Sequence, residues 1–143
     1  MFLGEYEYKV DSKGRVPLPP KFRQEFGDVV ILTRGTEQCI AAYRKSDFEK
    51  ISDAIAPEKI IENEKLRKLK RATFANAKDV LLDGQGRIAL PSRLKDYAQI
   101  KDVAILVGLN NSIELWNPEL WNAERIEAEG QVHQIIESLE SEQ

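Results

Sequence analysis

The chain has 143 residues, of which 42% are hydrophobic and 31% charged, and its formal net charge at pH 7 is -3. This balance excludes an intrinsically disordered chain, which needs high net charge and few apolar residues, and predicts one ordinary domain or two very small ones. A sequence pI near 5.3 argues, over the whole chain, against a nucleic-acid-binding protein, because such domains commonly have a pI above about 9.

Membrane, secretory and metal-binding classes are also disfavoured. No segment approaches the roughly 18 consecutive apolar residues of a membrane span, and the start MFLGEYEYKV has acids where a signal peptide has a basic segment. A single cysteine, Cys39, and a single histidine, His133, leave no cluster with the spacing of zinc ligands. We therefore expect a cytoplasmic protein without metal or other cofactor.

The first predicted elements are two strands joined by a tight turn. Residues 3–10, LGEYEYKV, alternate between apolar and charged side chains, which is typical of a half-buried strand. In DSKG, Asp11 and Gly14 stand at the first and fourth positions of a type I turn with a bulge. The following RVPLP predicts the second strand of a hairpin, and Pro17 confines that strand to an edge or an irregular ladder.

A short helix and two buried strands come next. Pro19 and Pro20 predict the helix start, and Gly27 predicts its end. The apolar runs VVIL and CIAAY predict the strands. The capping-box pattern SDFE at 46–49 then predicts a helix that starts near residue 47.

Residues 56–74 are rich in good helix formers and predict a helical connector. Five bases fall within seven of these residues: Lys65, Arg67, Lys68, Lys70 and Arg71. They indicate either a solvated helix face or a strip that contacts phosphates.

The second half of the chain repeats the first. Residues 83–95, DGQGRIALPSRLK, match residues 11–23 at an offset of 72, with five of the 13 positions identical where less than one is expected by chance. DVAILVGL and SIELW answer the earlier runs DVVILTRG and CIAAY. Because each half has only about 45 residues, the halves should share one core around a pseudo-two-fold axis, which would place the two turns near one another.

The C-terminal segment is acidic. Asn117 and Pro118 predict a helix cap followed by proline in the first turn. The last 25 residues hold seven acids and one base, with apolar residues partly at helical spacing, and predict either a packing or subunit-contact helix or a solvated tail. The expected division of the chain is repeat 1 at 5–47, connector at 48–75, repeat 2 at 76–119 and acidic tail at 120–143.

The repeated element Asp-x-x-Gly-Arg holds the candidate functional residues. Turn geometry explains its aspartates and glycines, and the residues expected to shape the turns are Asp11, Gly14, Asp83 and Gly86. Each arginine could contact a phosphate or a guanine edge, or form an ion pair with its own motif aspartate. Together with the neighbouring bases, the residues expected to contact DNA are Arg15, Arg87, Lys13, Lys9, Lys21, Arg23, Arg93 and Lys95.

Catalysis finds little support in the chain. Cys39 opens an apolar run and is expected to be a small buried side chain, while His133 has no nucleophile beside it. Four aromatic residues near corresponding ends of the halves are expected in the core or at subunit contacts: Tyr43, Phe48, Trp116 and Trp121. We therefore expect no enzyme activity.

The segments MFLGEYEYKVDSKGRVPLPPKFR, ILTRG, CIAAY, DGQGRIALPSRL and LVGLNNSIELW resemble the MraZ family, bacterial regulators with two SpoVT-AbrB-type repeats, over about residues 1–122. The resemblance implies an α+β, β-rich fold in which two AbrB-like swapped-hairpin, small-barrel halves are joined and followed by helices. The family's DxxxR motif corresponds to Asp11 with Arg15 and to Asp83 with Arg87, but Gln85 stands where the first copy has Lys13.

The resemblance also implies a function. Family members are cytoplasmic, nucleoid-associated transcription factors that form homo-oligomeric rings and bind tandem promoter repeats in double-stranded DNA at the division and cell-wall gene cluster. Two alternatives stay open: a protein-interaction scaffold for the rRNA methyltransferase encoded beside the family's gene, and an AbrB-type antitoxin or transition-state regulator. Residues 119–143 carry a net charge of -6 and residues 1–118 a net charge of +3, so DNA binding should depend on local basic groups.

Overall fold

The computed structural model describes residues 1–55 and 63–142. Over these residues the chain is an α+β protein with eight strands and five helices, and the order of elements in the first half recurs in the second. The predicted fold class, a β-rich tandem repeat, is confirmed. None of the helices in the two described ranges is long and apolar enough to cross a membrane.

The first half follows the predicted order of elements, which are β1 (Glu5–Lys9), β2 (Arg15–Pro17), α1 (Pro20–Phe26), β3 (Val29–Arg34), β4 (Ile40–Tyr43) and α2 (Lys45–Ile55). Helix α1 ends at Gly27, whose φ of 72° is a conformation that glycine adopts without strain. The predicted start of the next helix near residue 47 is wrong by two residues, because α2 begins at Lys45 and Ser46 lies inside its first turn.

The second half comprises α3 (Glu64–Phe74), β5 (Lys78–Leu81), β6 (Arg87–Ala89), α4 (Ser92–Ala98), β7 (Val103–Gly108), β8 (Ser112–Trp116) and α5 (Pro118–Ser141). Helix α3 confirms the helical part of the connector prediction, and residues 56–62 lie outside the described residues. The predicted cap at Asn117 is confirmed, because its Oδ1 accepts hydrogen bonds from the N–H groups of Glu119 and Leu120 at 2.8 and 3.1 Å. The acidic segment is helical to Ser141 and not an irregular tail.

Strand pairing differs from the hairpin that the sequence predicts within each half. Strand β1 pairs with β7, and β2 pairs with β6, so both strands that flank the first turn find their partners in the other half. The expectation that β1 and β2 form one ladder is therefore wrong, whereas the exchange of strands agrees with a swapped-hairpin fold. Since each half is too small for a core of its own, exchange between halves buries the apolar faces of both.

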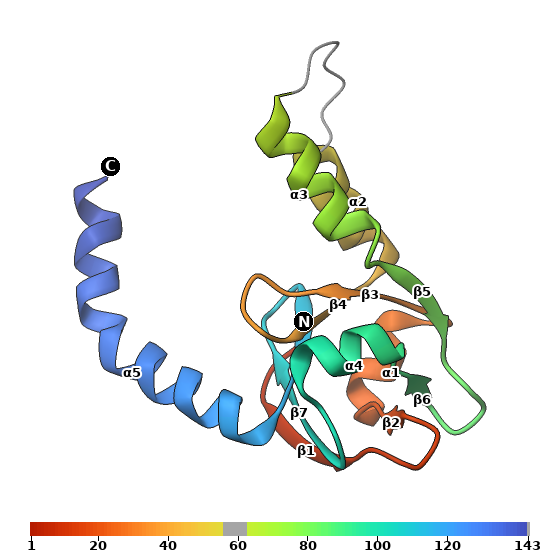
Figure 1. Ribbon diagram of the computed structural model, residues 1–143. Coiled ribbons are helices and arrows are strands. Elements are labelled where there is room, and N and C mark those ends of the chain that lie inside the picture. The colour runs from red at the N-terminus through yellow and green to blue at the C-terminus, as the bar shows by residue number, and fades with distance from the viewer. Residues whose placement is uncertain (56–62, 143) are drawn as a thin grey trace.

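The pairing obeys a pseudo-two-fold axis. The ladder β1–β7 corresponds to β5–β3, and β3–β4 corresponds to β7–β8, while β2–β6 and β4–β8 each join equivalent strands. Strands β1 and β5 are the edges of the six-stranded sheet, and they lie against β2 and β6 respectively. The two-stranded ribbon thus bridges both edges of the larger sheet, which gives a small barrel-like body (Figure 1).

The main core takes equivalent residues from both halves. Val16 faces Ile88 in the β2–β6 ladder and both are fully buried; the same cluster includes Leu18, Phe22, Leu90 and Leu94. A second cluster joins Cys39, next to β4, with Ile105, Val107 and Trp116 of β7 and β8, and Leu120 and Trp121 of α5 pack against it. These positions confirm that Cys39 is a buried apolar side chain and that Trp116 belongs to a core.

Three helices extend beyond this body. Helices α2 and α3 pack side by side, with the rings of Phe48 and Phe74 6.0 Å apart, and stand at the end of the molecule opposite β2 and β6 (Figure 1). Helix α5 leaves the body on another side and ends far from it (Figure 1). The two motif turns therefore belong to the barrel-like body and not to the helices that extend from it.

Candidate nucleic-acid interface

Each Asp-x-x-Gly-Arg motif forms a turn held by its own aspartate. Oδ1 of Asp11 accepts hydrogen bonds from the N–H groups of Lys13 and Arg15, both at 2.9 Å, and the N–H of Gly14 donates to the Asp11 carbonyl at 3.0 Å. Gly14 has a φ of 74°, the left-handed conformation that a bulged turn requires. The aspartate and glycine thus fix the direction in which the turn projects.

The second motif repeats this geometry. Oδ1 of Asp83 accepts from the N–H groups of Gln85 and Arg87 at 2.9 Å, and Gly86 has a φ of 72°. The two turns have equivalent hydrogen bonds and the same backbone conformation. They therefore present the same main-chain surface to a ligand.

Each motif arginine forms an ion pair with the aspartate of its own turn. Nε of Arg15 lies 2.7 Å from Oδ2 of Asp11, and Nε of Arg87 lies 2.7 Å from Oδ2 of Asp83. The ion pair between each motif arginine and its own aspartate, one of the two roles predicted for these arginines, is therefore present in both halves. A guanidinium has five N–H donors, and this pair uses the one on Nε, so the pair and a contact to a ligand are compatible.

The ion pair also holds the arginines in place. The Arg15 and Arg87 side chains are 32% and 25% exposed, so most of each side chain packs against the protein. A guanidinium whose Nε is already bonded loses less conformational freedom when it binds a planar acceptor such as a phosphate or a guanine edge. The aspartates therefore preorganise the two arginine side chains.

The two motif turns lie next to each other, as the sequence predicts. The N–H of Leu18 donates to the Gly86 carbonyl at 3.0 Å, and the N–H of Leu90 donates to the Gly14 carbonyl at 2.9 Å. These bonds extend the β2–β6 ladder up to both turns, which project from the same end of the body (Figure 1). The pairing of equivalent strands thus creates one surface from two copies of the motif.

Both motif aspartates are ionised at neutral pH. The N–H of Arg15, with its guanidinium and the N–H of Lys13, lowers the pKa of Asp11, and these bonds outweigh the desolvation that opposes them. The N–H of Arg87 lowers the pKa of Asp83 to about 2, with help from the Arg87 guanidinium and the N–H of Gln85. Since each aspartate balances one arginine, the positive charge of this surface depends on the neighbouring lysines and arginines.

Two of those neighbours connect the halves. Arg23 of α1 donates from Nε to the Leu18 carbonyl at 2.8 Å, and its guanidinium fills the space that a Cβ on Gly86 would occupy. Lys95 of α4 occupies the equivalent position, with Cδ and Nζ 3.8 Å from where a Cβ on Gly14 would lie. Each residue therefore reaches the turn of the opposite half and is placed to stabilise it.

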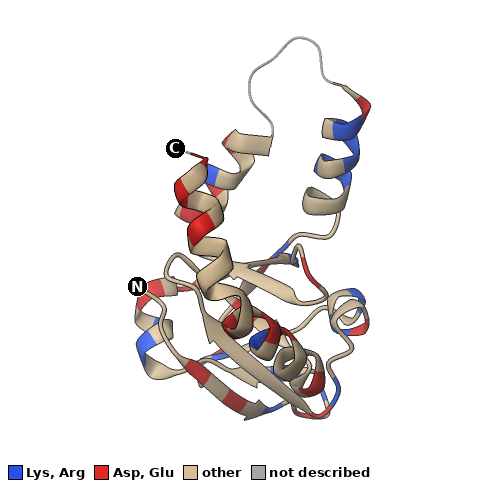
Figure 2. Ribbon diagram, turned by 90° about the vertical axis from the view of Figure 1, so that its left-hand side faces the viewer, with Lys and Arg blue, Asp and Glu red and all other residues tan. Residues whose placement is uncertain are grey.

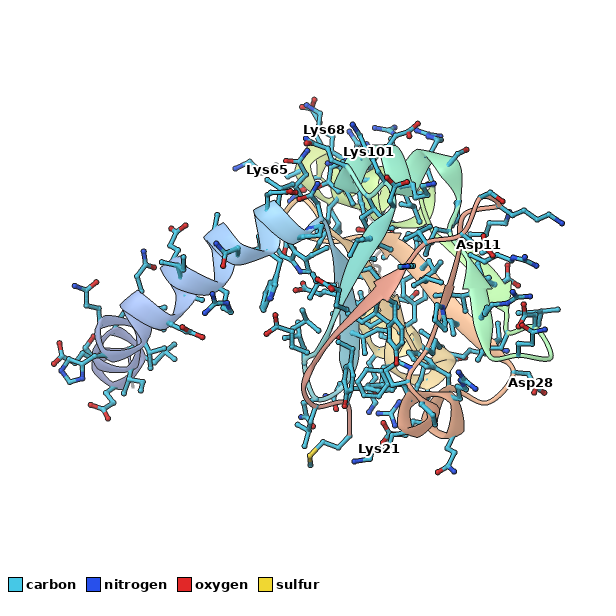
Figure 3. All side chains as sticks on the ribbon, turned by 90° about the horizontal axis from the view of Figure 1, so that it is seen from below. Asp11, Lys21, Asp28, Lys65, Lys68 and Lys101 are labelled. Carbon is cyan, nitrogen blue, oxygen red and sulfur yellow. The ribbon has the colours of Figure 1, made fainter. Side chains whose placement is uncertain are left out.

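The other predicted contact residues lie around this surface. Lys9 ends β1, Lys13 lies in the first turn and Arg93 lies in α4, and all three are exposed. Lys21 is exposed on α1 and lies apart from the Asp11 turn in Figure 3. The structure thus brings the two motifs together with Arg23 and Lys95, while Lys21 lies farther out.

The basic residues of α3 do not join this surface. Lys65 and Lys68 lie on the side of the molecule away from the Asp11 turn (Figure 3), and Nζ of Lys68 lies 3.3 Å from Glu64. The five bases of α3, for which a second phosphate-contacting strip is one of the two predicted roles, are therefore separate from the motif turns.

Glu114 is a half-buried acidic residue that the sequence pattern does not single out. Oε1 of Glu114 in β8 accepts a hydrogen bond from Nε1 of Trp116 at 3.0 Å, and burial raises the pKa of Glu114. Burial also raises the pKa of the neighbouring Cys39 thiol, with Glu114 adding to the effect, which keeps the thiol protonated and unreactive. The alternation in SIELW marks Glu114 as facing away from Ile113, but no local signal marks it as partly withdrawn from solvent.

Comparison with known proteins agrees with this architecture. The family model described as "MraZ protein, putative antitoxin-like" matches residues 1–71 and 73–136, which is two successive copies. "Transcriptional regulator MraZ" of Dehalococcoides mccartyi (strain 195) is 47% identical over 141 residues, covering 98% of this chain and 99% of that protein. Proteins of the same name from Roseiflexus sp. (strain RS-1) and Halothermothrix orenii are 40% and 36% identical, covering 85% and 98% of this chain and 84% and 97% of theirs.

Proposed function

Since this chain belongs to the MraZ family, whose compared members are named transcriptional regulators, we propose that it regulates transcription by binding promoter DNA through the paired motif turns. The observation that carries the proposal is the β2–β6 ladder, which sets two Asp-x-x-Gly-Arg turns side by side at one end of the body. Two equivalent turns related by a pseudo-two-fold axis suit a ligand that itself presents repeated, regularly spaced groups.

The residues divide into two roles. The guanidinium groups of Arg15 and Arg87, held by Asp11 and Asp83, contact base edges or the phosphates beside them. The surrounding bases contact the phosphate backbone and position the turns: Lys9, Lys13, Lys21, Arg23, Arg93 and Lys95. Because Gln85 replaces Lys13 in the second turn, the first turn binds DNA more strongly.

Local charge suffices for this function despite the acidic chain. Residues 119–143 hold seven acids and one base, and six of these acids lie in α5, which leaves the body on its own side (Figure 1). Electrostatic attraction between exposed groups is screened beyond about 8 to 10 Å at physiological ionic strength. The acids of this helix therefore do not cancel the basic groups at the motif turns.

Assembly multiplies a modest surface. In our proposal the chain forms a homo-oligomeric ring, whose motif turns bind tandem repeats at the promoter of the division and cell-wall gene cluster that contains its own gene. Linked sites raise the apparent affinity through effective concentration, without any new type of contact. A chain with a small local positive charge can bind DNA specifically in this way. Its proposed location is the cytoplasm, at the nucleoid.

A fluorescence titration against DNA from upstream of the chain's own gene tests this function, with a shuffled repeat as control. We expect tighter binding to the intact repeats and a steep fall of log affinity with log salt concentration, because binding releases counterions from phosphates. Equal affinity for both DNAs, or an affinity independent of salt, would refute the proposal. Persistent binding of a protein partner after loss of both motif arginines would favour the scaffold alternative instead.

A further inference from the structure

Only the first turns of α5 pack against the body. Leu120 and Trp121 cover the second core cluster, the rings of Trp121 and Trp116 are 5.6 Å apart, and Nε1 of Trp121 donates to Glu5 at 2.7 Å. These contacts anchor the start of the helix. From residue 126 to Ser141 every residue of α5 is exposed.

The exposed part of α5 carries an apolar stripe, which we define as Ala128, Val132, Ile135, Ile136 and Leu139. Val132, Ile135, Ile136 and Leu139 are 46–56% exposed. Residues 121, 125, 128, 132, 135 and 139 alternate in steps of four and three, the spacing of a helix seam that packs against another helix. The stripe continues the helix face by which Trp121 packs on the body. Beyond Trp121, that face has no packing partner among the described residues of this chain.

The negative charge of α5 argues against a second acidic helix as the partner of the stripe. The segment from Glu119 to the end of the chain has a net charge of -6. Glu129 and Glu140 border the stripe, because they lie seven residues before and four residues after Ile136 in the same helix. Pairing α5 with a second α5 would bring these acids together, so a basic surface fits the stripe better.

Helix α3 offers a basic surface of the right size. It holds five bases and one acid in 11 residues, about the length of the stripe, which spans residues 128–139. Lys65, Lys68, Leu69 and Ala72 share one face at helical spacing, and Leu69 is 48% exposed. We call this the α3 face. It has an apolar centre with basic residues beside it, so it is complementary to the apolar stripe and its acidic border. Figure 2 shows the basic residues along α3 and the acidic residues along α5.

The two surfaces cannot meet within one chain. Trp121 anchors the start of α5, α3 is fixed on α2 and on β3 through the hydrogen bond from Thr33 Oγ1 to the Thr73 carbonyl at 2.7 Å, and the helices stand apart (Figure 1). We propose that the apolar stripe of α5 docks on the α3 face of a second copy of this chain. This inference rests on the self-association proposed above and names the surfaces that form it.

The contact is head-to-tail, because each copy offers a stripe to one neighbour and an α3 face to another. Such heterologous contacts close into a ring when the rotation between copies allows it. The motif turns lie at the other end of the body from α3 (Figure 1), so they stay accessible in the assembly.

Site-specific disulfide formation tests the contact. The single native cysteine, Cys39, is fully buried, so it does not compete with introduced thiols. We mix full-length Leu139→Cys with full-length Leu69→Cys under mild oxidation. Disulfides require Cα atoms within about 7 Å, and we expect a mixed disulfide between the two variants. Gln134→Cys, on another face of α5, is the matched control and should give little mixed product.

Other cross-linking outcomes overturn the proposal. A dominant disulfide between two Leu139→Cys chains would show that α5 pairs with α5. Equal yields from Leu139→Cys and Gln134→Cys would show that the stripe makes no specific contact. Either result overturns the docking of α5 on α3 and leaves the DNA-binding proposal intact.

Charge reversal gives an independent test by light scattering. Lys65→Glu with Lys68→Glu, or Glu129→Lys with Glu140→Lys, should lower the assembly mass towards the 16.3 kDa of one chain, and all four changes in one chain should restore it. Lys21→Glu with Lys101→Glu changes the total charge equally and should leave the mass unchanged. An assembly mass that does not change on the α3 and α5 charge reversals overturns this inference alone. A wild-type chain that stays monomeric overturns it together with the proposed ring.

Discussion

Nη1 of Arg87 lies 3.9 Å from Oδ2 of Asp11, so the arginine of the second motif faces the aspartate of the first. Their distance in sequence is 76 residues, and the β2–β6 ladder brings them together by pairing Val16 with Ile88. The motif turns are thus parts of one surface, and a change in one turn should alter the other.

Acid should remove the stabilisation that the motif carboxylates provide. The folded protein lowers the pKa of Asp83 from 3.8 to about 2, so the carboxylate stabilises the fold above the unfolded pKa and loses this effect as pH falls through that window. Asp83→Asn keeps an oxygen acceptor but no charge. We expect wild type to have the larger free energy of unfolding at pH 7, and the difference to shrink as pH falls from 3.8 and to disappear only below about pH 2. Urea denaturation at several pH values measures it; a difference that does not depend on pH would contradict this account.

The two motif glycines should differ in their tolerance of alanine. Positive φ costs a residue with a Cβ about 1–2 kcal/mol at either site, and Gly14 has only ordinary van der Waals neighbours. A Cβ at Gly86 would also displace the Arg23 guanidinium and break its bond to the Leu18 carbonyl, worth about 1 kcal/mol more. Thermal unfolding should therefore show Gly86→Ala as the less stable variant. In an Arg23→Ala background the two glycine variants should converge.

Truncation under the ribbon should be costly. Ile88 is fully buried against the first half of the chain, so Ile88→Ala should lower the free energy of unfolding by about 2–5 kcal/mol, and Ile88→Val by about 1 kcal/mol. Ala89→Ser, at the exposed next position, should change it by less than about 0.5 kcal/mol. Denaturant titration of the three variants would contradict the shared core if Ile88→Ala behaved like Ala89→Ser.

The first motif arginine should govern sequence preference. Arg15→Ala should abolish preference for the intact promoter repeats over shuffled DNA while the assembly mass stays unchanged. Arg15→Lys should recover some affinity but little preference, because an ammonium lacks the planar fork. Lys78→Ala, which removes one exposed positive charge from β5 outside the motif turns and the α5 seam, is the control for fluorescence titration. Retained preference in Arg15→Ala at physiological salt would refute the role of this residue.

Neutralising Glu114 should stabilise the protein near neutral pH. Burial raises the pKa of this carboxyl group above its ordinary 4.5, and Glu37 and Glu124 add to the effect. Ionisation therefore costs the folded state stability as pH rises above the unfolded pKa. Glu114→Gln keeps an acceptor for Trp116 Nε1 without the charge, so its free energy of unfolding should exceed that of wild type at pH 7 and approach it below pH 4.5. A constant difference across this range would rule out ionisation as the cause.

Much of the local structure was predictable because it depends on nearby residues. Asp11 and Gly14 dictate a bulged turn through bonds that span at most four residues, and Asn117 caps a helix through the next turn. The repeat of the motif at an offset of 72 also indicated a shared core. The start of α2 was misplaced because the N–H groups of Asp47 and Phe48 already donate to the Arg44 carbonyl, so Ser46, which the capping-box pattern assigns to the cap, lies inside the first turn.

The sequence by itself determined the turns, the order of strands and helices, and the need for two halves to share one core, since hydrogen bonds of short range and the amount of apolar surface decide these. Only the tertiary structure decided which strands pair. Backbone N–H and C=O groups are alike in every strand, so β1 could bond to β2 or to β7 equally well by local criteria. The exchange between halves prevails because it buries Val16 against Ile88, and that same pairing places Arg87 opposite Asp11.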